Sequence, residues 1–130
     1  MQSTKLSAAL AILCLLGAPA AMADCKSKPS ETKLVKVTED QQGNPSVSPD
    51  TMHACEGDVV NWVFPGGAKK FLVSFTGENG SPCEFAPPTG ASVKCTIRSG
   101  AAQNGQSTPY DYDVSFEGGP PMDPTIIIDP

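Results

Sequence analysis

Five cysteines and one histidine are the side chains in this sequence with the widest chemical range. Cys14 lies in an apolar stretch near the N-terminus, and Cys25, Cys55, Cys83 and Cys95 lie further along the chain. An even number of cysteines in a small exported domain is typical of disulfide bonds, so we expect two, with three connectivities possible. We favour Cys83 with Cys95, which are close in sequence, and Cys25 with Cys55. A zinc site is disfavoured because no two cysteines have the C-x-x-C spacing.

His53 is the only histidine in the chain, and this limits both catalysis and metal binding. A metal site with two imidazoles is excluded, and a Ser-His-Asp or Cys-His arrangement could form only around this residue. Its neighbours Met52 and Ala54 place it in a short strand, where we expect an exposed or edge histidine. Met52 and His53 are also the best candidates for weak copper binding, together with an N-terminal segment.

Carboxylates alternate with apolar residues near the C-terminus. Asp111, Asp113 and Glu117 have the opposite parity to the aromatic and aliphatic residues between them, so we expect an acidic strip that faces solvent. Acid and base catalysis needs carboxylates in a cleft with different environments, which an exposed strip does not supply. Calcium binding with the nearby Asp123 and Asp129 is the alternative, although no D-x-D-x-D-G loop is present.

The N-terminus has the pattern of a cleaved signal peptide. Lys5 precedes an apolar run from Leu6 to Leu16, and Ala21-Met22-Ala23 forms a small-x-small cleavage site. The run is too short for a membrane anchor, and the acidic residue just before Cys25 does not fit a lipid-attachment site. We therefore expect residues 1–23 to be removed and residues 24–130 to form one domain, periplasmic or secreted.

The charge of the chain limits its partners. The sequence has 9 basic and 14 acidic residues, for a net charge of −5, and loss of Lys5 with the leader makes the domain more negative. Such a balance argues against binding to nucleic acid or to anionic lipid.

Short strands separated by turns are predicted for the rest of the chain. The sequence has 13 prolines and 12 glycines, which interrupt it too often for an amphipathic helix. Apolar residues instead recur at every second position, which places them on one face of a strand. The expected strands are residues 32–38, 51–55, 58–64, 71–75, 92–98, 110–116 and 126–128. Seven or eight short strands indicate an all-β fold, a Greek-key β-sandwich with Trp62 and Phe75 in its core.

Two motifs and their order resemble the cupredoxin family. Gly57-Asp58-x-Val60-x-Trp62 opens a central strand, and a strand with Tyr110-x-Tyr112 follows near the C-terminus. The resemblance extends from about Val47 to the C-terminus and implies the cupredoxin-like type of sandwich.

The resemblance also implies that the family's copper ligands are missing. Blue-copper members use one His after the Gly-Asp strand and a late cluster of Cys, His and Met. Aligned on the Tyr-x-Tyr element, this sequence has Val114 at the thiolate position, Glu117 at the second imidazole and Met122 near the axial thioether. Lys70 or Phe71 lies where the first imidazole would be. We therefore expect no blue-copper centre, and we expect Met122 to pack on the end of the sheet.

Three apolar loop segments contain Phe64, Phe85 and Met122. If they gather at one end of the sandwich, they form an exposed apolar patch of the kind that docks a partner. We therefore expect an exported, noncatalytic protein with a binding or structural role, monomeric and without a cofactor, whose unknown partner is a protein.

Two other functions remain open from the sequence. The first is a copper-handling or electron-transfer protein with an altered site built from Met52, His53 and Met122. The second is a secreted inhibitor or an immunoglobulin-like adhesive module, which a Greek-key sandwich serves equally well.

Overall fold

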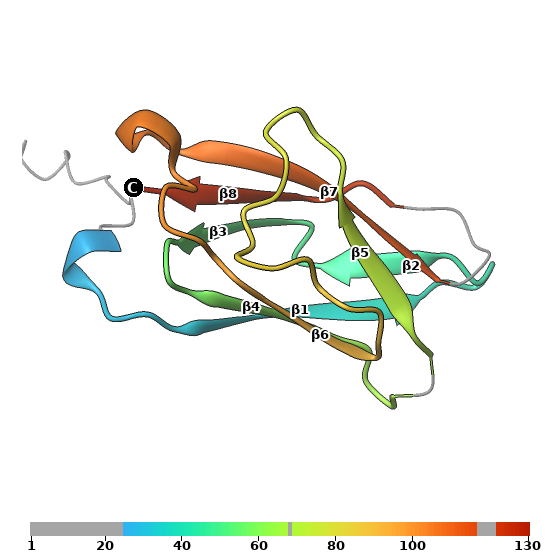
Figure 1. Ribbon diagram of the computed structural model, residues 1–130. Coiled ribbons are helices and arrows are strands. Elements are labelled where there is room, and N and C mark those ends of the chain that lie inside the picture. The colour runs from blue at the N-terminus through green and yellow to red at the C-terminus, as the bar shows by residue number, and fades with distance from the viewer. Residues whose placement is uncertain (1–24, 68, 117–121) are drawn as a thin grey trace, which may run out of the picture.

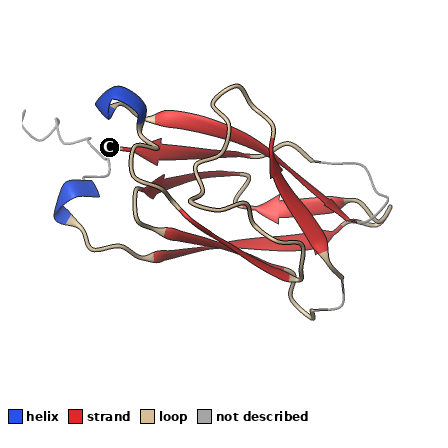
Figure 2. Cartoon of the chain, viewed as in Figure 1, coloured by secondary structure: helices blue, strands red, loops and turns tan. Residues whose placement is uncertain are grey.

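The computed structural model describes residues 25–67, 69–116 and 122–130, and within them the chain forms eight strands. The strands make two four-stranded sheets packed face to face (Figures 1 and 2). Their bounds are β1 Thr32–Glu39, β2 Pro45–Ser48, β3 Thr51–Cys55, β4 Val59–Val63, β5 Phe71–Phe75, β6 Ser92–Thr96, β7 Thr108–Phe116 and β8 Thr125–Asp129. The predicted all-β sandwich is confirmed.

The strand order fixes which strands are edges. It is β2-β1-β4-β6 in one sheet and β3-β8-β7-β5 in the other. β1 runs parallel to β4 and β3 runs parallel to β8, whereas the other neighbours are antiparallel. The four edge strands are therefore β2, β6, β3 and β5.

The inward-facing residues of both sheets form one core. Trp62 and Tyr112 are buried, and the indole Nε1–H of Trp62 donates a hydrogen bond to the Tyr112 hydroxyl over 3.1 Å. The two rings meet edge to face with centroids 5.4 Å apart, a favourable arrangement for aromatic pairs. Burial raises the pKa of Tyr112 to about 12. Phe75 is half-buried and packs on both rings at the border of the core.

Two disulfide bonds join Cys25 to Cys55 and Cys83 to Cys95, the connectivity favoured from the sequence. The first ties the short 3-10 helix η2, Cys25–Ser27, to the end of β3. The second ties the long β5–β6 connection to β6. Bonds of this kind are typical of oxidising compartments.

Most strand positions agree with the prediction, but one strand was missed and several ends differ. β2 is only four residues long, begins at Pro45 and ends beside the Ser48–Pro49 peptide bond, so its sequence has the signature of a turn. β7 begins at Thr108, two residues before its expected start, and the 3-10 helix η3, Gln103–Gly105, lies between β6 and β7. No helix among the described residues is long and apolar enough to cross a membrane. The predicted leader, residues 1–23, lies outside the described residues.

Candidate functional site

Two of the positions where a blue-copper centre would be expected, Val114 and Phe71, carry no metal-binding atom. Val114 is fully buried in β7 between Val73 of β5 and Met122. Phe71 is buried and pairs with Phe116, while Glu117 lies outside the described residues. Neither valine nor phenylalanine has a donor atom for copper, so the donor set does not fit a blue-copper centre.

The three residues considered for an altered copper site are separated in the structure. Met52 points into the core, whereas the next residue on β3, His53, points to the outer face. Met52 pairs with Ile126, four residues from Met122 along the chain, which is about 13 Å in an extended strand. Among residues 25–67, 69–116 and 122–130, no three His, Cys, Asp or Glu side chains lie close enough together to hold a metal ion.

His53 takes part in a hydrogen-bonded group at the end of β8. Asp129 is buried, and its Oδ2 lies 2.9 Å from Nδ1 of His53. The Ser107 hydroxyl donates to Asp129 Oδ1 over 2.6 Å. A catalytic triad needs the histidine between the serine and the carboxylate so that the imidazole can accept the hydroxyl proton. Here the carboxylate lies between them, so the group joins β3 and β8 to the residue before β7, and the imidazole is not placed to accept the Ser107 proton.

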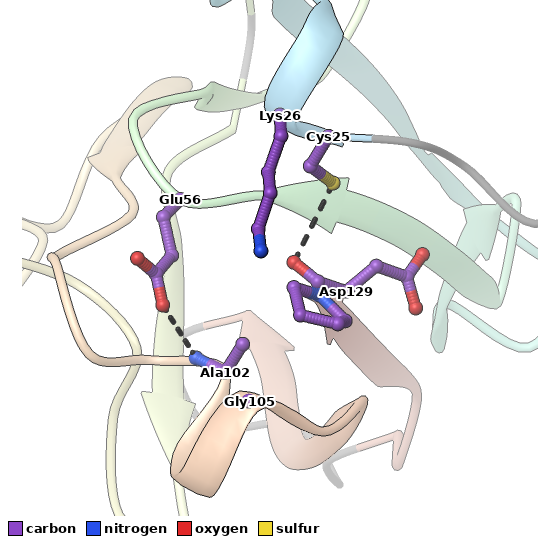
Figure 3. Close-up of a pocket in the computed structure, with 7 residues that line it drawn as sticks. Cys25, Lys26, Glu56, Ala102, Gly105 and Asp129 are labelled. Atoms are coloured by element: carbon purple, nitrogen blue, oxygen red, sulfur yellow. Dashed lines mark hydrogen bonds between the residues drawn. The ribbon is translucent and has the colours of Figure 1, made fainter.

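A cavity of about 370 Å³ opens near the same end of the sandwich. It is lined by the Cys25 end of η2, by Glu56 and Ala102, and by the end of β8, and the Lys26 side chain extends into it (Figure 3). Glu56 is used structurally, since its Oε2 accepts the backbone N–H of Ala102. The cavity therefore offers one flexible cation on a short helix and no convergent set of polar groups.

The predicted acidic strip lies on the outer face of β7 where the structure describes it. Asp111 is exposed and accepts a hydrogen bond from the Thr125 hydroxyl, whereas Asp113 is half-buried. Partial burial and a hydrogen bond to the carboxyl group of Asp123 raise the pKa of Asp113. Asp123 precedes β8 and Asp129 is its last residue, so the two lie at opposite ends of the strand and do not form the calcium site considered from the sequence.

The more informative feature is a groove of about 380 Å³ along β5. One side is formed by β5 itself, from Leu72 to Phe75, and the other by Ser81, Cys83, Ala86 and Pro87 of the β5–β6 connection. In Figure 1 this connection rises from the end of β5 and returns in front of the sandwich to β6.

The hydrogen-bond register of β5 shows which backbone groups face this groove. The N–H of Thr76 bonds to the carbonyl of Asp111, and bonded pairs alternate along an antiparallel ladder. Leu72 and Ser74 therefore bond to β7, whereas the N–H and C=O groups of Phe71, Val73 and Phe75 point away from it. Phe71 exchanges both bonds with Gly90. Within the described part of the chain, nothing bonds the outward groups of Val73 and Phe75.

The far wall of the groove is held by the other sheet. Cys83 forms an isolated antiparallel bridge with Ile97 and a disulfide bond with Cys95. The N–H of Glu84 bonds to the carbonyl of Thr96, and the N–H of Arg98 bonds to the carbonyl of Pro82. This segment thus extends the first sheet beyond β6 and cannot close freely onto β5.

The three predicted contact residues differ in how far their side chains are exposed to solvent. Phe64 packs against the core and lies 5.6 Å from Phe116, centroid to centroid. Met122 is half-buried beside Val114 and packs against the core. Phe85, in contrast, is 82% exposed and is next to Ala86 of the groove wall, while Leu72 on β5 is 43% exposed. Only Phe85 of the three presents most of its side chain to solvent.

Sequence reasoning missed several residues with structural importance. Asp58 was used only as part of a motif, yet it is buried and its two carboxylate oxygens accept the backbone N–H groups of Glu31 and Cys55. Leu72 lies between the inward-facing Phe71 and Val73, and the same alternation places its side chain on the outer face of β5. The pairing of Asp129 with His53 and Ser107 joins residues distant in sequence, and no local pattern signals it.

Comparison with known proteins supports the fold. A purple cupredoxin from Nitrosopumilus maritimus is similar in structure, with a TM-score of 0.51 and 14% sequence identity over 75% of this chain and 99% of that chain. At this identity the likeness shows the fold alone, so the sandwich is cupredoxin-like in architecture. No family model matches the sequence, and no curated protein is similar to it.

Proposed function

We propose that this protein is an exported, noncatalytic binding module that uses a cupredoxin-like sandwich to present an apolar side surface to a protein partner. The observation that carries the proposal is Phe85, a large aromatic side chain 82% exposed on a loop fixed by a disulfide bond. Aromatic residues are enriched where proteins bind one another, because they bury a large area at a small cost in conformational entropy.

The surroundings of Phe85 support a binding role. Leu72 is exposed and lines the groove, whose other wall includes Ala86 next to Phe85 and is fixed by the Cys83–Cys95 bond. A preformed surface loses little entropy on association. The donor set at the copper positions and the order of Ser107, Asp129 and His53 give no comparable support to redox chemistry or nucleophilic catalysis.

Co-purification from the exported fraction tests this function. We would express the full chain with its own leader and compare three proteins: the wild type, Phe85→Ala, and Leu34→Ala as a matched control. Leu34 is 57% exposed on β1 in the other sheet, so it controls for the loss of an exposed apolar residue elsewhere.

The proposal predicts a partner that is recovered with the wild type and with Leu34→Ala and is lost with Phe85→Ala. Recovery of no partner under mild conditions contradicts it. Equal recovery with all three proteins contradicts the assignment to Phe85.

A further inference from the structure

The outer edge of β5 has backbone groups without hydrogen-bond partners. The N–H and C=O groups of Val73 and Phe75 point into the groove without a partner among the described residues. Unpaired edges of this kind are templates for another strand, and proteins usually protect them. Of the other edges, β2 begins at Pro45 and is followed by Pro49, and the C-terminal end of β6 is covered where the N–H of Glu84 bonds to the carbonyl of Thr96.

One position of this edge is already paired with another segment of the chain. Gly90 forms a reciprocal pair of hydrogen bonds with Phe71, of 2.9 and 3.2 Å. Beyond Phe71 the connection leaves β5 and follows the other sheet instead, held there by the Cys83–Cys95 bond and the Cys83–Ile97 bridge. The groove therefore lies where a further strand could pair with β5. Gly90 occupies one end of that position, and the rest of it is empty.

The charges around the gap favour a basic occupant. Residues that pair across strands share a face, and Asp113 pairs with Ser74. Asp113 lies beside Asp123, and the exposed Glu84 precedes Phe85 on the opposite wall. The guanidinium of Arg98 is used internally, since it donates to the carbonyl of Ser81 and to the Tyr110 hydroxyl. Long basic side chains over Leu72 and Ser74 would reach these carboxylates.

We propose that β5 binds an extended peptide segment of a partner protein as an added strand, bonded to Val73 and Phe75. Alternate side chains of the segment face opposite sides. Those opposite Val73 and Phe75 are apolar and enter the groove beside Cys83 and Ala86, while those between them are basic. This inference rests on the proposed binding function and specifies its ligand class. Recognition by strand addition derives affinity from backbone hydrogen bonds and specificity from alternate side chains.

The test measures amide hydrogen exchange by NMR on the full mature protein with synthetic peptides. The probe is a pool of capped peptides of about five residues, the usual strand length, in which Val, Ile, Leu or Phe alternates with Lys. One control pool has Glu in place of Lys, and a second has N-methyl groups on alternate backbone nitrogens. We expect the basic pool to slow exchange at Val73 and Phe75 by about tenfold or more, and neither control pool to do so.

Two matched protein variants sharpen the test. Leu72→Lys places a cation under the basic side chains of the added strand and should abolish the protection. Leu34→Lys makes the same change at an exposed leucine of the other sheet and should leave it intact. The N-methylated pool decides the question without any variant if Leu72→Lys does not fold.

The outcomes separate this inference from the proposed function. Unchanged exchange at Val73 and Phe75 with the basic pool, or equal protection by all pools, overturns strand addition. If exchange is unchanged while Phe85→Ala still loses the partner, the binding function stands and the strand model is wrong. If exchange slows while Phe85→Ala keeps the partner, strand addition stands and Phe85 is not the docking residue.

Discussion

Asp58 determines how the chain enters β4. It follows Gly57, whose φ of 90° is readily adopted only by glycine and whose added Cβ would lie 2.9 Å from Ser30 Oγ. The buried Asp58 carboxylate then bonds the N–H groups of Glu31 and Cys55, at 3.0 and 2.9 Å. The Gly-Asp pair thus holds the start of β1, the end of β3 and the start of β4 together.

Replacing Asp58 with alanine should lower the free energy of unfolding by about 3 kcal/mol, because two partly buried N–H groups lose a charged acceptor. Asp40 supplies a matched control, since its carboxylate also accepts two backbone N–H groups but in an exposed turn. Asp40→Ala should cost less than about 1 kcal/mol. Urea unfolding followed by Trp62 fluorescence measures both. Equal losses for the two variants would contradict the role assigned to Asp58.

Asp113 makes stability depend on pH. Its pKa is raised in the folded protein by partial burial and by Asp123, so the folded state retains this proton to higher pH than the unfolded chain. The stabilising contribution is present in acid and is lost as the pH rises through the raised pKa. Asp113→Asn removes the charge that is disfavoured at neutral pH.

We therefore expect Asp113→Asn to raise the melting temperature near neutral pH and to change it little below the ordinary pKa range of aspartate. Asp111→Asn is the control, because Asp111 is exposed on the same strand. Melting curves across this pH range measure both proteins. A gain for Asp113→Asn that is the same in acid as at neutral pH would show that the charge of Asp113, disfavoured by burial and by Asp123, is not its cause.

The two disulfide bonds close loops of different length and hold different parts of the molecule. Cys83–Cys95 closes a separation of 12 residues, and Cys25–Cys55 closes one of 30. Loop-closure entropy gives stabilisations of about 3 and about 3.6 kcal/mol, respectively. Of the two disulfide bonds, however, only Cys83–Cys95 fixes the wall of the β5 groove.

The two double variants should therefore separate stability from binding. Cys25→Ala with Cys55→Ala should lose at least as much unfolding free energy as Cys83→Ala with Cys95→Ala, yet keep the co-purifying partner. Cys83→Ala with Cys95→Ala should lose the partner, because the loop carrying Phe85 is released. Urea unfolding and partner recovery are measured in parallel. Loss of the partner in proportion to lost stability would contradict a specific role for the Cys83 wall.

The sequence predicts the strands well because each element carries its own alternation. Val60 and Trp62, or Tyr110 and Tyr112, point inward in the structure as their spacing indicates. The sequence leaves three disulfide connectivities possible, and the short separation of Cys83 and Cys95 favours the pairing that the structure has. β2 could not be predicted, because it is short, begins at a proline and is followed by another. Its local sequence does not favour a strand, and pairing with β1 stabilises it.

The candidate binding site is predicted less well from the sequence. It depends on which apolar side chains stay exposed and which backbone groups stay without a hydrogen-bond partner after folding. Phe64, Phe85 and Met122 have similar apolar character in sequence, yet only Phe85 remains largely exposed after packing. The free edge of β5 appears only when strand order and hydrogen-bond register are both known. Neither can be read from a single strand.

The whole molecule has a cupredoxin-like architecture, and its candidate binding surface lies along the side of the sandwich. The family's ligand positions in this chain include Val114 and Phe71, which pack in the sandwich and cannot bind copper. The features suited to binding, Phe85 and the free edge of β5, lie beside the groove instead. We therefore propose that the partner binds this side of the sandwich and not its end.

Photo-crosslinking in living cells tests that claim most directly. A photoreactive phenylalanine analogue is placed at position 85 or, as the control, at the exposed Pro65 in the β4–β5 loop, in the full chain with its own leader. The account predicts a discrete adduct from position 85 after irradiation and none from position 65. An adduct from position 65 alone, or no adduct from either position, would contradict it.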